Sequence, residues 1–365
     1  MIKTDYVLEQ FYSLNSGNYL EDLYKIAPEA LWYVLGRNEC SKSLIKKLNI
    51  RGLVDDFELI EKYWENIPIL RSDELPEGAV VINCSFSISP ISADKLLKSL
   101  LSIKTIAYFE LHQSNPQEFE LPNFVKECRL DLEVNKEKYL KLYERFEDDE
   151  SRDIFNSLIA YRMTANYTYL NMFSIRFKDQ YFEPFIGDLR ASIFADCGGF
   201  DGDTTEEFVK RYPHYKKVYF FEPDSVNLKK AKSRLKNLRD IEFKELGVSD
   251  KAGKLSFKIG GGSASQISRD GEAKISVVPL DSYIENIPLT FIKMDLEGWE
   301  LKALKGSSKQ IKKNKPTLAI AVYHSVSDFW KIPDFVTKLN PNYKIYLRHY
   351  TEGWSESVMY FVEND

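Results

Sequence analysis

The feature that most constrains the fold is a regular alternation of strand-like and helix-like segments from Ile193 to the end of the sequence. Short apolar runs alternate with stretches of about 10–15 residues whose apolar positions recur at helical spacing, which is typical of βαβ units and a parallel sheet. The first five runs read IFADCG, VYFFEP, IEFKELGV, FIKMDLEG and PTLAIAVY. The last two, YKIYLRHY and VMYFVEN, are joined by a turn without a helix, so the final strand should be antiparallel. We therefore predict an α/β fold with a mainly parallel seven-stranded sheet and an antiparallel last strand.

The first half of the sequence is organised differently. Apolar residues from Tyr6 to about Tyr63 recur mostly at helical spacing, which predicts small helices. Further on, VVINC, SADKLLKSLLSI and TIAYFEL predict a strand, a helix and a strand, which make one β-α-β unit. Its turn, Ser85-Phe86-Ser87, lacks the glycines of a dinucleotide turn, which favours a structural Rossmann-like unit over a second nucleotide site. We predict four segments: an N-terminal helical segment (1–75), a small Rossmann-like β-α-β unit (76–130), a helical connector (131–185) and the main α/β domain (186–365).

Composition excludes several classes of protein. A net charge of −5 and a pI near 5.7 argue against non-specific binding to nucleic acid, which needs an excess of Lys and Arg. The four cysteines show no CxxC or Cys/His ligand spacing, so we expect reduced thiols in a cytoplasmic protein and no structural zinc. The first residues carry charges inside every apolar run, unlike a signal peptide. No run approaches the ~20 apolar residues that a membrane-spanning helix needs.

A glycine-rich turn, DCGGFDGDT, follows the first strand of the main domain. In an open α/β sheet the ligand lies at the carboxyl ends of the strands, and Gly198, Gly199 and Gly202 would allow a sharp turn and a close approach. The alternative is that the glycines only allow the chain to turn from strand to helix, with no ligand bound there. Glu222, 26 positions after Asp196 at the tip of the second strand, argues against that alternative because its carboxylate can accept from both hydroxyls of a ribose.

The acidic residues around this turn select among nucleotide ligands. Asp196, Asp201 and Asp203 would repel a pyrophosphate and attract a sulfonium or an amine. The dinucleotide fingerprint G-x-G-x-x-G also fails, because Cys197 occupies the first glycine position. The turn therefore favours S-adenosylmethionine over NAD.

Several segments in order, DCGGFDGDT, FEPD, LGVSDKAG, VPLDSYI and FIKMDLEGWE, resemble the FkbM-type S-adenosylmethionine-dependent methyltransferases. The tail LAIAVYHSVSDFWKIPDFVTKLNP, followed by YLRHY, also resembles a branch of that family. The resemblance runs from about Tyr181 to the end, half of the sequence, and implies a class I methyltransferase domain over residues 186–365. It also implies O-methylation, often of sugars in polysaccharides or of secondary metabolites. Two departures are Phe200, in the middle glycine slot of the general class I motif, and Trp299, which would reshape the acceptor pocket.

These observations give a set of candidate cofactor contacts. They are Asp196, Cys197, Gly198, Gly199, Gly202, Asp203, Thr204, Glu222, Pro223, Gly247, Val248 and Asp295. Methyl transfer is an in-line displacement that a positioned base accelerates by about 10²–10⁴-fold. We expect His324, at the end of the fifth strand, to be that base, and Asp295 to face the methyl group or the acceptor. The alternatives are a strand-end histidine paired with backbone and, for Asp295 and Glu297, a helix cap.

The acceptor is expected to be a sugar or glycan hydroxyl. Candidate acceptor contacts are Ser263, Ser265, Glu297, Trp299, Tyr323, Arg348 and His349, of which the two serines lie in the Gly/Ser-rich insertion GGGSASQISRDGEAK. Magnesium held by Asp295, Glu297, His324 and His349 is an alternative that the spacing does not favour, so we expect no metal ligands. An NAD-linked sugar oxidoreductase and an inactive nucleotide-binding module stay as alternatives, and a homo-oligomer stays open.

Overall fold

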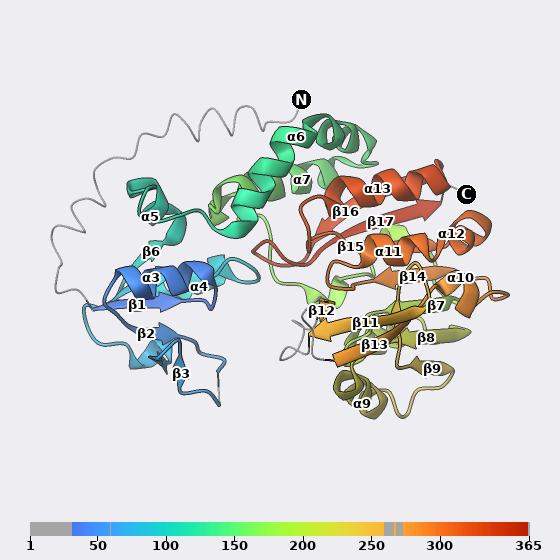
Figure 1. Cartoon of the computed structure of the whole chain (residues 1–365), viewed down its shortest axis with the longest axis horizontal. Helices are drawn as coiled ribbons and strands as arrows, with labels where there is room; N and C mark the ends of the chain where they lie inside the picture. Colours follow the sequence, from blue (N-terminus) through green and yellow to red (C-terminus); the bar gives the residue numbers. More distant parts are fainter. Residues whose placement is uncertain (1–30, 59, 259–265, 268–272, 364–365) are drawn as a thin grey trace. The chain divides into compact units, whose positions relative to one another are not determined.

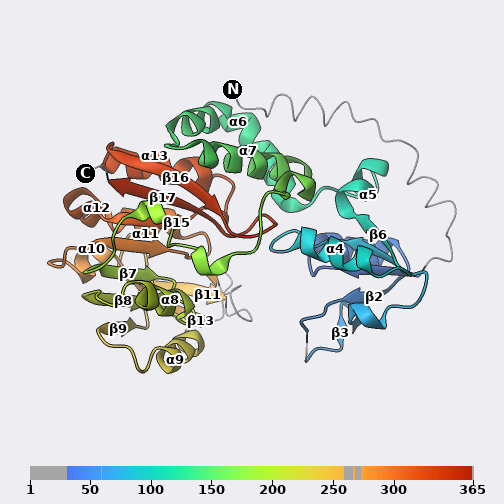
Figure 2. The ribbon, with the colours of Figure 1, turned by 180° about the vertical axis from the view of Figure 1, so that it is seen from behind.

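The computed structural model describes residues 31–58, 60–258, 266–267 and 273–363, and these residues form two compact units. Unit 1 contains residues up to Lys136, residues 153–175 and residues 350–355. Unit 2 contains residues 137–152, 176–349 and those from Glu356 on. Figures 1 and 2 show the ribbon from two sides. No helix among the described residues is long and apolar enough to cross a membrane.

Unit 2 is built on a seven-stranded sheet with the order β16-β17-β15-β14-β7-β8-β9. All neighbours pair in parallel except β17, which is antiparallel to β15 and β16, so the predicted fold class is confirmed. The strands are β7 (Ile193–Cys197), β8 (Lys217–Phe221), β9 (Ile241–Lys244), β14 (Phe291–Met294), β15 (Thr317–Ala321), β16 (Tyr343–His349) and β17 (Ser357–Glu363).

Helices cover this sheet because its central strands are apolar on both faces. Every residue of β14 is buried, as are four of the five residues of β7, β8 and β15, as expected for parallel strands between helical layers. The ring of Phe208 packs on Phe194 at 4.7 Å between centroids and so fixes the first helix on the sheet. The helices are α8 (Asp203–Arg211), α9 (Ser225–Arg234), α10 (Leu280–Tyr283), α11 (Glu300–Lys305), α12 (Ser308–Asn314) and α13 (Asp328–Leu339), with the 3₁₀ turns η3 (Phe177–Asp179) and η4 (Pro184–Ile186).

The insertion between β9 and β14 forms a sheet of its own. Its order is β10-β13-β11-β12, from the strands β10 (Gly247–Val248), β11 (Gly253–Lys258), β12 (Gln266–Ile267) and β13 (Ala273–Val278). The run IEFKELGV, predicted as one strand, is therefore two strands that belong to different sheets, because β10 pairs with β13. Ser263 and Ser265 lie outside the described residues.

Unit 1 is built on a six-stranded sheet with the order β3-β4-β2-β1-β5-β6. Its strands are β1 (Trp32–Leu35), β2 (Ile50–Val54), β3 (Tyr63–Trp64), β4 (Ile67–Leu70), β5 (Val80–Asn83) and β6 (Lys104–Ala107), and only β3 pairs antiparallel. Its helices are α3 (Glu39–Lys47), α4 (Pro90–Ser99) and α5 (Tyr108–Ser114), with the 3₁₀ turns η1 (Ser72–Glu74) and η2 (Tyr167–Leu170). Two longer helices, α6 (Asn123–Arg145) and α7 (Asp149–Thr164), contribute residues to both units, and α6 is interrupted at the non-helical Asn135.

The prediction of helices up to residue 75 is wrong for most of the described part of that segment, which holds four strands beside the helix α3 and the turn η1. The run WYVL has helical spacing relative to its neighbours, but pairing with β2 and β5 on both sides makes it a central strand. Tertiary pairing thus overrides the local periodicity. The predicted strand TIAYFEL is shorter, since the helix α5 begins at Tyr108.

The turn after β5 is occupied by the hairpin loop, residues 350–355, which joins β16 to β17 and belongs to unit 1. Backbone N–H groups of Glu352 and Trp354 donate to the carbonyls of Ile88 and Phe86 at 2.8 and 3.0 Å. The Glu352 carboxylate accepts from Ser92 N and Oγ at 2.7 and 2.8 Å, in the first turn of α4. A carboxylate of the chain itself therefore fills the place where a helix N-terminus in a nucleotide-binding sheet receives a phosphate.

Gly353→Ala is expected to destabilise the protein by about 1–3 kcal/mol, because overpacking at a closely packed position forces the backbone to shift. A Cβ at Gly353 would lie 2.2 Å from the carbonyl oxygen of Ser87 and 2.4 Å from that of Phe86. Urea unfolding measures the change, with Gly253→Ala as the control, since a Cβ there meets nothing within 4 Å. Equal unfolding midpoints for the two variants would contradict the close packing of the hairpin loop.

Candidate active site

The glycine turn, Gly198 to Gly202, lies at the carboxyl end of β7 and requires glycine for steric reasons. Gly198 has φ +79°, and a Cβ there would lie 1.9 Å from the carbonyl oxygen of Asp295. Gly199 faces the ring of Phe220, which a Cβ would meet at 2.3 Å. The glycine turn therefore touches the backbone at the end of β14 directly.

Asp196, in the strand β7 just before the glycine turn, stabilises that turn. Its carboxylate is fully buried, accepts from Thr205 Oγ1 at 2.7 Å and lies 3.2 Å from Lys293 Nζ. Lys293 in turn donates to the carbonyl of Gly198 at 2.6 Å. Burial alone would lower the pKa of Lys293, but the carboxylates of Asp196, Asp295 and Asp203 raise it to about 12, so the ammonium stays charged. This arrangement makes Asp196 a support of the turn through Lys293 and Thr205.

Glu222 joins the tip of β8 to the same turn. Its carboxylate accepts from the backbone N–H of Phe200 at 2.9 Å and from that of Asp224 at 2.8 Å. Burial raises the pKa of Glu222 to about 7, against the effect of these two N–H donors. Pro223 is half-buried beside it, and Asp224 caps α9. The predicted juxtaposition of the second strand's acid with the glycine turn is present.

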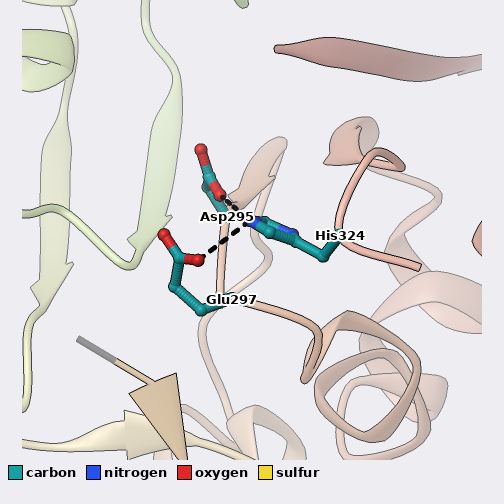
Figure 3. A group of neighbouring side chains, drawn as sticks. All are labelled: Asp295, Glu297 and His324. Carbon is teal, nitrogen blue, oxygen red and sulfur yellow. Dashed lines mark ion pairs between the residues drawn. The ribbon is translucent and has the colours of Figure 1, made fainter. Parts of the chain in front are cut away.

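The carboxylate–histidine centre, Asp295, Glu297 and His324, lies at the ends of β14 and β15 (Figure 3). His324 Nε2 is 3.3 Å from Glu297 Oε2 and 3.5 Å from Asp295 Oδ1. Glu297 has φ +52° and precedes Gly298 at φ +89°, so a tight left-handed turn brings the Glu297 carboxylate back toward the strand ends. Three of the predicted site residues, from the ends of two neighbouring strands, therefore meet.

Glu300 holds the other side of the His324 ring, and sequence reasoning missed it. Its buried Oε1 lies 3.0 Å from His324 Nδ1 and accepts from Leu296 N at 2.7 Å. Burial alone would lower the pKa of His324, but Glu300, Glu297 and Asp295 raise it well above its ordinary value. Glu300 is the first residue of α11 and reads in the sequence as an ordinary helix-start acid.

Two phenols fix Asp295. Tyr181 donates to Asp295 Oδ2 at 2.8 Å, and Tyr323 lies 3.3 Å from both carboxylate oxygens. Tyr181 adopts φ +75°, a strained conformation, and its own N–H donates to the hydroxyl of Tyr360. Burial, and secondly Asp295, raises the pKa of both phenols well above the ordinary range, so they remain donors. No sequence signal pointed to Tyr181, which is 114 positions from Asp295.

Arg348 and His349 have partners within the fold. Arg348 pairs with Asp148 at 2.6 Å and Glu150 at 3.0 Å, and its guanidinium lies over the ring of Phe185. His349 is buried, with Nδ1 2.9 Å from Ser357 Oγ across the β16–β17 pair. These contacts give both side chains a structural part, and a role in acceptor binding stays a prediction.

The remaining predicted residues lie around the turns. Asp203 and Thr204 begin α8, where Asp203 accepts from the backbone N–H of Thr204, and Cys197 is buried at the end of β7. Trp299 Nε1 donates to Ser249 Oγ at 3.0 Å, directly after Gly247 and Val248 of β10. Trp299 thus links the turn after β14 to the end of β10.

Residues 196–347 match the model of the methyltransferase FkbM domain. The fold is similar to the solved structure of methyltransferase FkbM from Methylobacillus flagellatus KT, with 21% identity, 98% of each chain covered and a TM-score of 0.73. An rRNA methylase from Streptococcus thermophilus shows 19% identity over 49% of this chain and 90% of its own, at a TM-score of 0.33. Fibrillarin from Aeropyrum pernix, with natively bound S-adenosyl-L-methionine, shows 11% identity over 51% and 71%, at a TM-score of 0.30. No curated protein matches the sequence.

Proposed function

We propose that this chain, whose residues 196–347 are a methyltransferase domain of the FkbM family, transfers the methyl group of S-adenosylmethionine to a sugar hydroxyl of a glycan or its precursor. The observation that carries the proposal is the contact of Gly198 with the backbone of Asp295, where a Cβ would lie 1.9 Å from the carbonyl oxygen. Because of this contact, a cofactor bound on the glycine turn has its reactive end beside the carboxylate–histidine centre.

The cofactor is assigned from charge and hydrogen bonding. Each oxygen of Glu222 accepts one backbone N–H, which leaves lone pairs free for the two ribose hydroxyls. Asp203, which begins α8 four positions after Gly199, favours a cationic ligand over a pyrophosphate, whereas the charge of Asp201 is paired with Arg234. These features support S-adenosylmethionine and disfavour the alternative of an NAD-linked oxidoreductase.

The chemistry assigned to the centre is removal of the acceptor's proton during in-line transfer. The hydroxyl oxygen attacks the methyl carbon, the sulfur takes the bonding pair to give S-adenosylhomocysteine, and the hydroxyl proton passes to Nε2 of the neutral His324 ring, the form that predominates only above the raised pKa of this histidine. Glu300 orients the ring from Nδ1, and Asp295 and Glu297 stabilise the resulting imidazolium. We place the acceptor next to Glu297, Trp299 and Tyr323, which surround the same turn.

Glu222→Gln is expected to weaken binding of S-adenosylmethionine by about 10- to 100-fold, because charge-assisted hydrogen bonds contribute ~1.5–3 kcal/mol each. The wild-type affinity should also fall as the pH drops through about 7, where Glu222 takes up a proton, and it should level off above that pH. Titration calorimetry with S-adenosylmethionine, S-adenosylhomocysteine and NAD⁺ at several pH values measures both effects.

The matched control is Glu245→Gln, an exposed glutamate on the strand-end segment that follows β9. It should bind as the wild type does. Binding of NAD⁺ in place of the adenosyl ligands, or equal affinity in both variants, would refute the assigned cofactor site.

A further inference from the structure

The imidazole of His324 is enclosed by the carboxylates of Asp295, Glu297 and Glu300. Its side chain is 9% exposed, and neither ring nitrogen makes a well-aligned hydrogen bond to any residue that the structure describes. Figure 3 shows Nε2 directed toward the space between Asp295 and Glu297. A buried imidazole aimed at two carboxylates needs a positive species between them, which is either a proton or a cation.

The distances from His324 Nε2 to the two carboxylates fit a tetrahedral metal ion. Bonds of ~2.0–2.2 Å from a tetrahedral ion to nitrogen and oxygen place neighbouring ligand atoms about 3.3–3.6 Å apart. Nε2 lies 3.3 Å from Glu297 Oε2 and 3.5 Å from Asp295 Oδ1, and the three residues offer ligand atoms all within 4.8 Å of one another.

The surroundings also match those of a metal-binding histidine. A ligating histidine usually has a carboxylate at its other nitrogen, and Glu300 Oε1 lies 3.0 Å from Nδ1. The hydroxyls of Tyr181 and Tyr323 contact the carboxylate of Asp295 and hold it in position. One imidazole with two carboxylates suits zinc, manganese or cobalt, whereas magnesium prefers oxygen ligands alone.

We propose that Asp295, Glu297 and His324 bind a divalent transition-metal ion such as zinc, and that the bound ion inhibits methyl transfer. The ion and the acceptor's proton compete for the single lone pair of His324 Nε2. Metal binding itself is independent of the proposed function, while the inhibition depends on it.

In the test, the purified full chain is titrated with Co²⁺, with the visible absorption of the bound ion as the readout, and with Zn²⁺, with calorimetry as the readout. One ion per chain is expected, with at least tenfold weaker binding in Glu297→Gln and in His324→Asn and much weaker binding of Mg²⁺. The exposed Glu285→Gln serves as the control and should bind as the wild type does. Absence of binding, or unchanged affinity in both site variants, overturns the metal site.

Binding of S-adenosylhomocysteine to each variant shows that it is folded and tests the cofactor site separately. Failure of that binding in the wild type refutes the proposed function and leaves the Co²⁺ result standing. Addition of Zn²⁺ should abolish transfer, and a chelator should restore it. Activation by Zn²⁺ would overturn the competition for the lone pair.

Discussion

His324→Asn should lower the turnover number for methyl transfer by about 10²–10⁴-fold, the usual contribution of a positioned general base. The affinity for S-adenosylmethionine should change little, because the ring lies at the ends of β14 and β15, whereas Glu222, the proposed ribose contact, lies at the end of β8. The measurement is formation of S-adenosylhomocysteine with an acceptor found by screening sugars and glycan precursors.

His214→Asn is the matched control, since His214 is exposed and lies after α8. A loss of turnover in His324→Asn with unchanged cofactor affinity assigns the histidine to the chemical step. Turnover equal to that of the control would remove His324 from the mechanism and leave Asp295 as the acceptor-facing group.

The second large effect is on stability. Lys293→Met should destabilise the protein by about 3–5 kcal/mol, because removal of one partner leaves a buried charge uncompensated. The lost ammonium lies 3.2 Å from the fully buried Asp196 and donates to the carbonyl of Gly198. Urea unfolding of Lys293→Met against the exposed Lys305→Met gives the difference.

A second substitution separates charge from packing. Adding Asp196→Asn to Lys293→Met should recover part of the lost stability, because it removes the unpaired carboxylate. If the double variant is less stable than Lys293→Met alone, the cost comes from packing and the ion pair is not what supports the glycine turn.

The sequence predicted unit 2 well because local and long-range signals agree there. The central strands β7, β8, β14 and β15 are almost entirely buried, as parallel strands between helical layers are, and the run after each of them predicts a helix. Strand order then brings the ends of β7, β8, β14 and β15 to one edge, so that Glu222, Asp295 and His324 could be expected near the glycine turn.

Other parts of the structure had no local signal. The strands β1 and β2 form because they pair with neighbouring strands of the sheet. The apolar residues around them recur at helical spacing, so the sequence predicts helices there. Tyr181 reaches Asp295 from a segment without regular secondary structure, and Glu300 turns inward at a helix start where acids are normally solvated. Arg348 lies near the end of β16, as the sequence predicts. Its partners Asp148 and Glu150 lie about 200 positions earlier in the sequence, so no local pattern points to them.

The hairpin loop also dictates the order in which the protein can fold. Ser92 and Glu352, which it brings together, are 260 positions apart, so the closing contact of the N-terminal sheet has a very long loop to bridge. A nascent chain that has emerged only to the end of α7 holds β1 to β6 but not the segment that covers the turn after β5. Contacts of such separation slow folding and leave unpaired backbone exposed during synthesis. The N-terminal sheet should therefore reach its native state only late in translation, and fragments that stop before residue 350 should be prone to aggregation.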